Sequence, residues 1–295
     1  MTVAVLGASG MLGSMVVRVL STSMSVTATV RDVAFMRPMD RVEWRHLDVL
    51  DTDVSDLTML LHGCCAAINC IGVVTQRMDD TVWKVNSVFP QMLALAAARA
   101  DCHVLQIATD CVFDGQNGTY AEHGSEPRGA PRDKYGMSKW QGEVRSPWVR
   151  HVRCSIVGPE YHGKSLLGWF LAHPPRSRVE GYTNHFWNGV TTQAFAQVCR
   201  GIVDNPKTIG DQRLPWVQHL VPADRVSKYQ LLSYFRECYR PDINVIPVRH
   251  TLNVDRTLTT VKPEVNERLW RGAGYPEPPP ILRMIQDMAR AEVTI

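Results

Sequence analysis

Short apolar runs alternate with helix-like patterns along the first half of the chain. Most of these runs are continuously apolar, so they predict strands that are buried on both faces of a sheet. They cover residues 3–6, 26–30, 42–48, 66–71, 104–108 and 149–157. Helical spacing of apolar positions predicts helices at residues 11–20, 57–61, 82–100 and 133–145. Strands that alternate with helices predict an α/β fold, with a doubly wound parallel sheet covered on both faces.

The pattern changes after residue 158. Gly158-Pro159, Pro174-Pro175 and the proline-rich residues 276–280 interrupt it, and shorter helical patterns follow at residues 166–171, 192–203 and 227–239. We therefore predict a first domain over residues 1–158 that binds a dinucleotide. Residues 159–295 form mainly a smaller, substrate-binding C-terminal lobe, with some segments returning to the first domain.

Composition excludes several classes of protein. The 295 residues are 45% hydrophobic and 21% charged, as in ordinary globular proteins. A net charge of +3 with scattered basic residues gives no reason to expect a nucleic-acid partner. No apolar stretch approaches the roughly 18 to 20 residues that cross a membrane. The eight cysteines form no C-x-x-C pair and lack histidines at ligand spacing, so we expect reduced thiols, no metal site and a cytoplasmic location.

A glycine-rich turn joins the first predicted strand to the first predicted helix. It has the spacing G-x-x-G-x-x-G. Glycines allow a tight turn and close approach of the backbone to a pyrophosphate, while the helix N-terminus favours the anion. We predict a Rossmann-type dinucleotide site. Its first contacts are Gly7, Ser9, Gly10, Met11, Leu12 and Gly13.

The end of the second strand bears on the choice of cofactor. Arginine suits the 2′-phosphate of NADP, whereas an acidic residue suits the ribose hydroxyls of NAD. Here Arg31 comes first, so we predict NADPH, and NADH remains possible because Asp32 follows. Asp48 and Val49 would lie near the adenine, although Asp48 could equally be a solvated residue at a strand end. After the fourth strand, further cofactor contacts are predicted at Cys70, Ile71 and Gly72.

Tyr135 and Lys139 are four residues apart, so they share one face of a predicted helix. Held against a nicotinamide, such a pair can protonate a carbonyl oxygen as hydride reaches carbon. A free phenol titrates near ~10 and needs a neighbouring cation to become more acidic. Thr109, at the end of the fifth strand, could donate to the same carbonyl. The three residues predict a carbonyl reductase site.

At this point the chain resembles the extended short-chain dehydrogenase/reductases, and within them the dTDP-4-dehydrorhamnose reductase group. The glycine turn at 7–13, the run Ala-Thr-Asp-Cys-Val-Phe-Asp-Gly at 108–115 and the Tyr135–Lys139 pair carry the resemblance. The resemblance to this group extends to Gly142-Glu143, to the segment 153–159 and to Asn86. Residues 1–160 match well and the remainder matches loosely.

The resemblance implies an NADPH-dependent reductase of a nucleotide-linked 4-keto-6-deoxyhexose, with dTDP or UDP as the nucleotide and a rhamnose-type product. Tyr135 would donate the proton. Lys139 would lower the pKa of Tyr135 and hold the nicotinamide ribose, and Thr109 would orient the sugar carbonyl. Asn86 would contact the cofactor. Asp110, Cys111 and Val112 would line the substrate pocket.

Cys111 departs from the rhamnose reductases, which typically carry tyrosine there. A cysteine at this place is similar to bifunctional 3,5-epimerase/4-reductases, where it moves protons beside the ketone. A thiol titrating near ~8.5 suits that role, especially near cations such as Lys139. Its companion would be His162 or Lys164. Alternatively, Cys111 is a small residue that lines the sugar pocket.

Residues 184–192 are rich in aromatic and amide side chains, so Trp187 and Asn188 could bind substrate or could serve a structural loop. His219 and Arg256 are possible contacts to the diphosphate. A non-catalytic regulatory or binding protein on the same fold is a third reading of the chain. Helix 82–100 and the helix that carries Tyr135 could form a homodimer interface.

Overall fold

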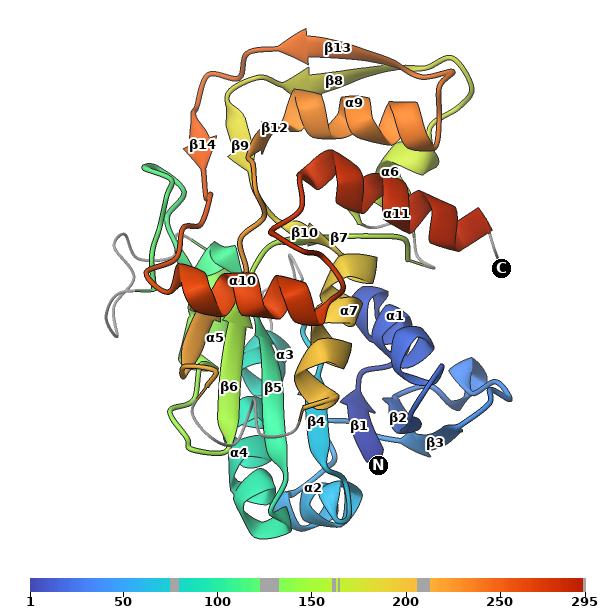
Figure 1. Cartoon of the computed structure of the whole chain (residues 1–295), viewed down its shortest axis with the longest axis vertical. Helices are drawn as coiled ribbons and strands as arrows, with labels where there is room; N and C mark the ends of the chain where they lie inside the picture. Colours follow the sequence, from blue (N-terminus) through green and yellow to red (C-terminus); the bar gives the residue numbers. More distant parts are fainter. Residues whose placement is uncertain (75–79, 123–132, 161–162, 164, 206–212, 294–295) are drawn as a thin grey trace.

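The computed structural model describes residues 1–74, 80–122, 133–160, 163, 165–205 and 213–293. A seven-stranded sheet with all neighbours parallel runs through the first half, in the order β11-β6-β5-β4-β1-β2-β3 (Figure 1). Its strands are β1 (Thr2–Leu6), β2 (Ser25–Val30), β3 (Val42–His46), β4 (Ala66–Asn69), β5 (His103–Ala108), β6 (Val149–Arg153) and β11 (Val217–His219). The predicted doubly wound α/β fold is confirmed.

Helices cover both faces of this sheet, each over its own apolar core (Figure 1). One face carries α1 (Met11–Leu20), α7 (Thr192–Val203) and α10 (Pro263–Gly272). The other carries α2 (Val54–Leu61) and α4 (Phe89–Ala100). The strands between them are almost fully buried, which explains their continuous apolar runs. The exception is β3, an edge strand with exposed polar residues.

The predicted helix 82–100 is continuous but irregular. It consists of α3 (Thr81–Trp83), a π-helical turn (Lys84–Val88) and α4. Pro90 has no N–H to donate to the carbonyl of Asn86, four residues earlier, so the regular ladder is broken at this point. The π-helical turn packs against α5 (Lys134–Gln141), the helix that carries Tyr135.

The predicted strand 149–157 divides in two. Only β6 joins the main sheet, whereas β7 (Ile156–Val157) pairs with β10 (Val190–Thr191). The seventh strand of the main sheet, β11, comes from the second half of the chain and lies beside β6. The second half is therefore interwoven with the first, and a boundary at residue 158 stays a prediction.

The remaining elements form the C-terminal lobe, at the top of Figure 1. Two small sheets, β8–β13 and β12–β9–β14, pack with helices on the same apolar core as α7. Their bounds are α6 (Leu166–Leu171), β8 (Arg178–Tyr182), β9 (His185–Trp187), β12 (Val226–Ser227), α9 (Lys228–Cys238), β13 (Asn244–Val248), β14 (Val254–Asp255) and α11 (Ile281–Val293).

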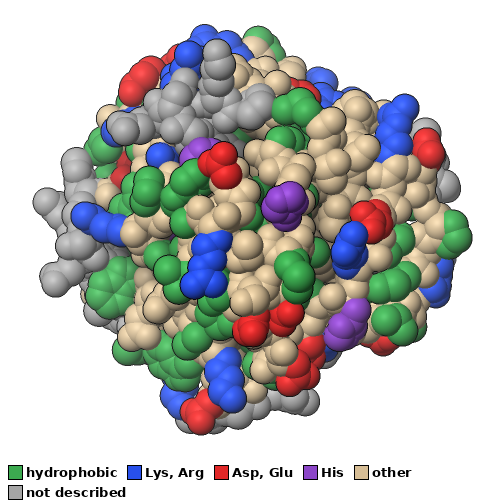
Figure 2. All heavy atoms as spheres, turned by 90° about the horizontal axis from the view of Figure 1, so that it is seen from below, with side chains coloured by type: hydrophobic (Ala, Val, Ile, Leu, Met, Phe, Trp, Pro, Cys, Tyr) green, Lys and Arg blue, Asp and Glu red, His purple; other side chains and the backbone are tan. Residues whose placement is uncertain are grey.

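The surface gives no sign of a large area of one charge on the face drawn in Figure 2, where basic and acidic side chains are interspersed. Among the described residues, no helix is both long and apolar enough to cross a membrane. The same residues contain no cluster of three His, Cys, Asp or Glu side chains that could hold a metal ion.

Candidate active site

A cavity of about 360 Å³ lies at the carboxyl ends of the central strands. This is the edge where parallel α/β sheets bind ligands. Ten of the predicted cofactor contacts line it: Gly7, Ser9, Gly10, Met11, Arg31, Asp48, Val49, Cys70, Ile71 and Gly72. Sequence reasoning missed other lining residues, namely Thr29, Leu47, Leu50, Val73, Thr81, Val85 and Glu160. Most of these residues lie next to the ends of predicted strands in the sequence, so their positions could have identified them as cavity residues. Glu160 comes from the second half and gave no signal.

The glycine turn has the geometry that a pyrophosphate site needs. Gly7 has φ +81°, which favours glycine, and its N–H donates to Thr29 Oγ1 at 3.1 Å. A Cβ on Gly13 would lie 2.1 Å from the Gly7 carbonyl oxygen, so α1 can pack this closely only with glycine there. No described side chain caps the N-terminus of α1, which leaves its dipole directed at the cavity.

Two residues of the predicted fingerprint have a structural role instead. Leu12 is buried in the core and Gly13 packs against the turn, and neither lines the cavity. Helical periodicity explains this difference, because these positions of α1 face the sheet while Met11 faces the cavity.

The end of β2 separates the roles of Arg31 and Asp32. β2 ends at Val30, and Arg31 lines the cavity. The Asp32 carboxylate instead accepts a hydrogen bond from Ala34 N at 2.9 Å and caps a short 3₁₀ helix. Across the cavity, Asp48 accepts from Leu50 N at 3.0 Å. Arg31 and Asp48 thus line the cavity, whereas Asp32 is engaged in the cap.

Asn86 fixes the cavity wall from behind. Its side chain exchanges two hydrogen bonds with the backbone of Val73, both at 3.0 Å, and donates to Ser138 Oγ at 3.0 Å. Asn86 is buried and is not among the residues that line the cavity, so its contact with the cofactor stays a prediction. Asn86 joins the end of β4 to α5.

Thr109, Tyr135 and Lys139 place their functional groups near the end of β5. The Thr109 hydroxyl accepts from Cys111 N at 3.1 Å, donates to Asp110 Oδ1 at 3.3 Å and shares a hydrogen bond with the Tyr135 hydroxyl. Lys139 Nζ donates to the Ile107 carbonyl at 3.0 Å. All three functional groups thus meet where β5 ends.

Lys139 also connects this cluster to the cavity. A Cβ built on Gly72, a cavity residue, would lie 3.8 Å from Lys139 Nζ and 3.7 Å from Asn86 Oδ1. Glycine at this position leaves the ammonium open to the cavity edge. Burial lowers the pKa of Lys139 to about 8, while Glu143 and Cys70 act in the opposite direction.

The pKa of Tyr135 moves against the sequence prediction. Burial raises it, the groups of Cys111, Asp110 and Asp133 add to the rise, and the hydrogen bond from Thr109 opposes it. Lys139 is not among the groups that act on the Tyr135 pKa, and its ammonium donates to the Ile107 carbonyl. A raised pKa keeps the phenol protonated at neutral pH, which is the form that donates a proton.

Cys111 also differs from expectation. Burial and the neighbouring Asp110 raise its pKa to about 12, against smaller effects of Thr109 and Arg256. It is therefore a neutral thiol at physiological pH and not the acidified thiol expected near Lys139. The two companions considered for it, His162 and Lys164, lie outside the described residues.

Two cations of the C-terminal lobe face Asp110 instead. Burial raises the pKa of Asp110, and Arg256 and Lys228 act to lower it. Arg256 Nε donates to the Phe113 carbonyl at 3.3 Å, and Arg256 packs over Gly115. Lys228 is the first residue of α9 and acts electrostatically on both Asp110 and Cys111. Sequence reasoning missed Lys228, because its segment shows only helical periodicity.

Four other predicted substrate contacts are structural. Trp187 is 4% exposed and belongs to the main core, and Val112 is fully buried beside Phe113. Asn188 is buried, and its amide donates to the Leu258 carbonyl at 2.7 Å and accepts from Leu258 N at 2.9 Å, so it holds the Leu258 backbone. His219 is fully buried, with Nδ1 2.7 Å from the Thr259 carbonyl.

Comparisons with known proteins identify a family for this chain. A family model described as RmlD substrate binding domain matches residues 1–251. The probable low-salt glycan biosynthesis reductase Agl14 of Haloferax volcanii is 31% identical over 177 residues, covering 56% of this chain and 57% of that protein. A dTDP-4-dehydrorhamnose reductase of Mycobacterium tuberculosis is 29% identical over 167 residues, 48% of each protein. The chain thus spans about half the length of the curated relatives it matches.

Solved structures share the fold at low identity. A dTDP-4-dehydrorhamnose reductase from Clostridium acetobutylicum has a TM-score of 0.71 at 17% identity, with both chains fully covered. The enzyme of that name from Bacillus anthracis, solved with NADP, has a TM-score of 0.68 at 15% identity, covering 98% of this chain and 99% of that one. A dTDP-glucose 4,6-dehydratase from the same organism, solved with NAD, reaches 0.73 at 12%, covering 100% of this chain and 97% of that one.

Proposed function

The chain belongs to the family described as RmlD substrate binding domain, and on that premise we propose that it is an NADPH-dependent reductase of a nucleotide-linked 4-keto-6-deoxyhexose. The nucleotide would be dTDP or UDP, and the product would be of the rhamnose type. One observation supports this most directly. Thr109, Tyr135 and Lys139 meet at the end of β5, beside a cavity lined by the glycine turn.

The proposed reaction uses these three side chains in distinct roles. Tyr135, kept protonated by its raised pKa, donates its proton to the ketone oxygen. Thr109, which is hydrogen-bonded to the Tyr135 hydroxyl, orients the ketone oxygen of the substrate. Lys139, whose Nζ lies beside Gly72 at the cavity edge, would hold the nicotinamide ribose and bring a positive charge to the end of β5. When bound, NADPH would supply the hydride to sugar C4.

The NADPH preference is proposed on the position of Arg31. A guanidinium at the end of β2 suits a 2′-phosphate, and the competing carboxylate of Asp32 is engaged with Ala34 N. NADH would lack the group that Arg31 binds.

The substrate side is proposed on charge. Lys228 and Arg256 place two cations against the single carboxylate of Asp110, close to Thr109. The excess positive charge suits the phosphate that joins a nucleotide to its sugar. Their location in the C-terminal lobe agrees with a substrate held between lobe and sheet.

Incubation with NADPH and either dTDP- or UDP-linked 4-keto-rhamnose, the 3,5-epimer of 4-keto-6-deoxyglucose, tests the proposal, because reduction at C4 alone gives a rhamnose-type product only from this epimer. We expect NADPH oxidation with one of the two, and NMR of the product would give the configuration at C4. The Thr109→Val variant is the matched comparison, because it removes the hydroxyl at nearly constant volume. No oxidation with either substrate, despite measurable NADPH binding, would favour the alternative of a regulatory or binding protein. A homodimer through α4 and α5 stays a prediction.

A further inference from the structure

A buried ion pair joins the segment after α5 to the end of β6, close enough to Lys139 to act on its charge. Arg153 Nε and Nη2 donate to the two carboxylate oxygens of Glu143 at 2.7 and 2.5 Å. The side chains are only 5% and 3% exposed, respectively. A bidentate ion pair that is almost fully buried fixes both side chains in one geometry. Glu143 follows α5 and is four residues after Lys139.

The sheet register places this pair next to the reaction site. Arg153 is the last residue of β6 and is paired with Ala108 of β5, the residue before Thr109. On the other side it is paired with His219 of β11. Glu143 is therefore held by the same strand ends that present Thr109.

Arg153 has no second carboxylate among the described residues. Its Nη1 lies 3.4 Å from His219 Nε2, while His219 Nδ1 lies 2.7 Å from the Thr259 carbonyl. This geometry fits a neutral imidazole that donates from Nδ1 and accepts at Nε2. Burial lowers the pKa of His219 to about 4, in agreement. The negative charge on Glu143 thus faces two cations, Arg153 and Lys139.

The other titratable groups near Lys139 are uncharged at neutral pH or positive. The Cys70 thiol has its pKa raised to about 12 by burial, and His151, on β6, has its pKa lowered to about 4 by burial. Arg153 is a further cation. Among the groups that act on Lys139, Glu143 alone supplies a formal negative charge at neutral pH.

We propose that Glu143 is a positioning residue which, held by Arg153, keeps the buried Lys139 ammonium charged at the end of β5, where its Nζ donates to the Ile107 carbonyl. The link to catalysis rests on the proposed function, whereas the effect on the charge of Lys139 does not. A buried lysine without a counter-ion loses its proton more readily. Without Glu143, a substantial part of the protein would carry a neutral Lys139 at pH 7.

An NMR titration of Lys139 tests this directly in the Glu143→Gln variant. The side-chain Cε signal, assigned by its loss in Lys139→Met, reports the ammonium whether or not the protein reduces a sugar nucleotide. We expect the pKa of Lys139 to fall by about one pH unit or more, as for removal of a close charge in a site shielded from water.

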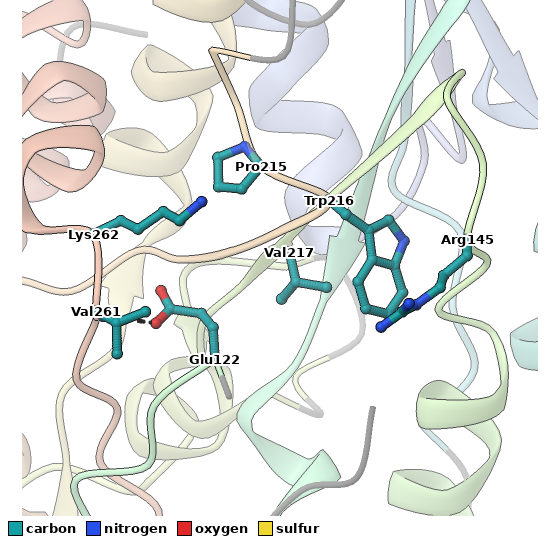
Figure 3. A pocket seen from close by; sticks show the side chains of 7 residues that line it. All are labelled: Glu122, Arg145, Pro215, Trp216, Val217, Val261 and Lys262. Carbon is teal, nitrogen blue, oxygen red and sulfur yellow. Dashed lines mark hydrogen bonds between the residues drawn. The ribbon is translucent and has the colours of Figure 1, made fainter. Parts of the chain in front are cut away.

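Glu122→Gln is the matched control. Glu122 is a second partly buried carboxylate of the same region, and it accepts from His219 N at 2.8 Å and Val261 N at 2.9 Å (Figure 3). It lines a separate cavity of about 310 Å³ beside Lys262, in which Arg145 stacks on Trp216. It is not among the groups that act on Lys139. The control removes the same charge and should leave the Lys139 titration unchanged.

An unchanged Lys139 titration in Glu143→Gln, or an equal shift in both variants, would overturn the proposal. If Glu143→Gln fails to fold, the double variant Glu143→Leu with Arg153→Met removes both members of the ion pair. The pKa of Lys139 should then fall by less than in Glu143→Gln, because the Arg153 cation is lost together with the carboxylate, and no fall would refute the role. If the Lys139 titration shifts in Glu143→Gln but the wild-type protein reduces no sugar nucleotide, the effect of Glu143 on Lys139 stands and the proposed function is rejected.

Discussion

The carboxyl edge of the main sheet and the C-terminal lobe both offer polar and aromatic side chains, but they use them differently. At the sheet edge, Arg31 and Lys139 retain polar groups that reach the cavity or its rim. In the lobe, Trp187 is buried and Asn188 binds the Leu258 backbone. The lobe instead faces the site with cations, Lys228 and Arg256. Residue type alone therefore does not identify a ligand contact, because burial and the partners that a side chain already has decide whether it reaches the cavity.

The largest effect is expected at the sheet edge. Tyr135→Phe removes the proposed proton donor, and general-acid catalysis is worth roughly 10²–10⁴-fold, so we expect kcat/KM to fall about 10³-fold. The measurement is NADPH oxidation with the accepted sugar nucleotide. Tyr182→Phe, in the C-terminal lobe, is the control and should stay within about twofold. Retention of a tenth of the activity by Tyr135→Phe would rule out the proposed donor.

A large effect on stability is expected where the second half joins the sheet. His151 is fully buried on β6, with Nε2 2.9 Å from the Val144 carbonyl. Nδ1 has no hydrogen-bond partner among the described residues. Burial lowers its pKa from 6.5 to about 4. Between these values the unfolded chain binds the proton and the folded protein does not, so stability falls as pH falls through this window.

The loss attributable to His151 should approach about 3 kcal/mol by pH 4 and vanish above pH 6.5. Urea unfolding of the wild type and His151→Gln across this range measures it, because the variant lacks the titrating group. Other histidines titrate in both proteins and cancel in the difference. Parallel pH profiles would show that His151 is not buried in its neutral form.

A smaller loss of stability is expected in the lobe. Asn188→Ala removes two hydrogen bonds and leaves the N–H and carbonyl of buried Leu258 unpaired, which costs about 2 kcal/mol. Asn117→Ala, at an exposed asparagine, should change the free energy of unfolding by less than about 0.5 kcal/mol. If Asn188→Ala instead leaves stability intact and raises KM for the sugar nucleotide, Asn188 contacts substrate as the sequence suggested.

Sequence patterns predicted the fold well, because apolar strands and helical spacing report burial directly. The family resemblance is confirmed by the match over residues 1–251. Helix α7 has the predicted ends, whereas the strand 149–157 divides because its two parts enter different sheets. No local pattern encodes that choice of partner.

The site was predictable to the extent that it depends on short motifs. The glycine turn and the Tyr135–Lys139 spacing are local, so they were readable. The pKa of Tyr135 was not, because burial is set by the whole fold. Lys228 escaped notice for the same reason: its relation to Asp110 spans 118 residues, from 110 to 228.

At the cofactor side of the sheet edge, we expect a change of about tenfold in KM for the cofactor. Arg31→Ala should raise KM for NADPH about tenfold, equivalent to about 1.4 kcal/mol, and leave KM for NADH within about twofold. Asp32→Asn is the control, because its side chain caps Ala34 N and should not affect the preference. A loss of NADH use in Asp32→Asn, with NADPH unaffected by Arg31→Ala, would reverse the assignment.

The smallest effect is expected for Cys111, which lies between the two regions. Its neutral thiol, with a pKa raised to about 12, is a weak acid and is only rarely a thiolate base at pH 7, so proton exchange beside the ketone should be slow. In D₂O we expect no deuterium at sugar C3 or C5 of the product by NMR, and Cys111→Ser should keep reductase activity within about threefold. Deuterium at either carbon, lost in Cys111→Ser, would establish the epimerase alternative. It would also mean that the bound substrate changes the charges that Asp110, Arg256 and Lys228 present to this thiol.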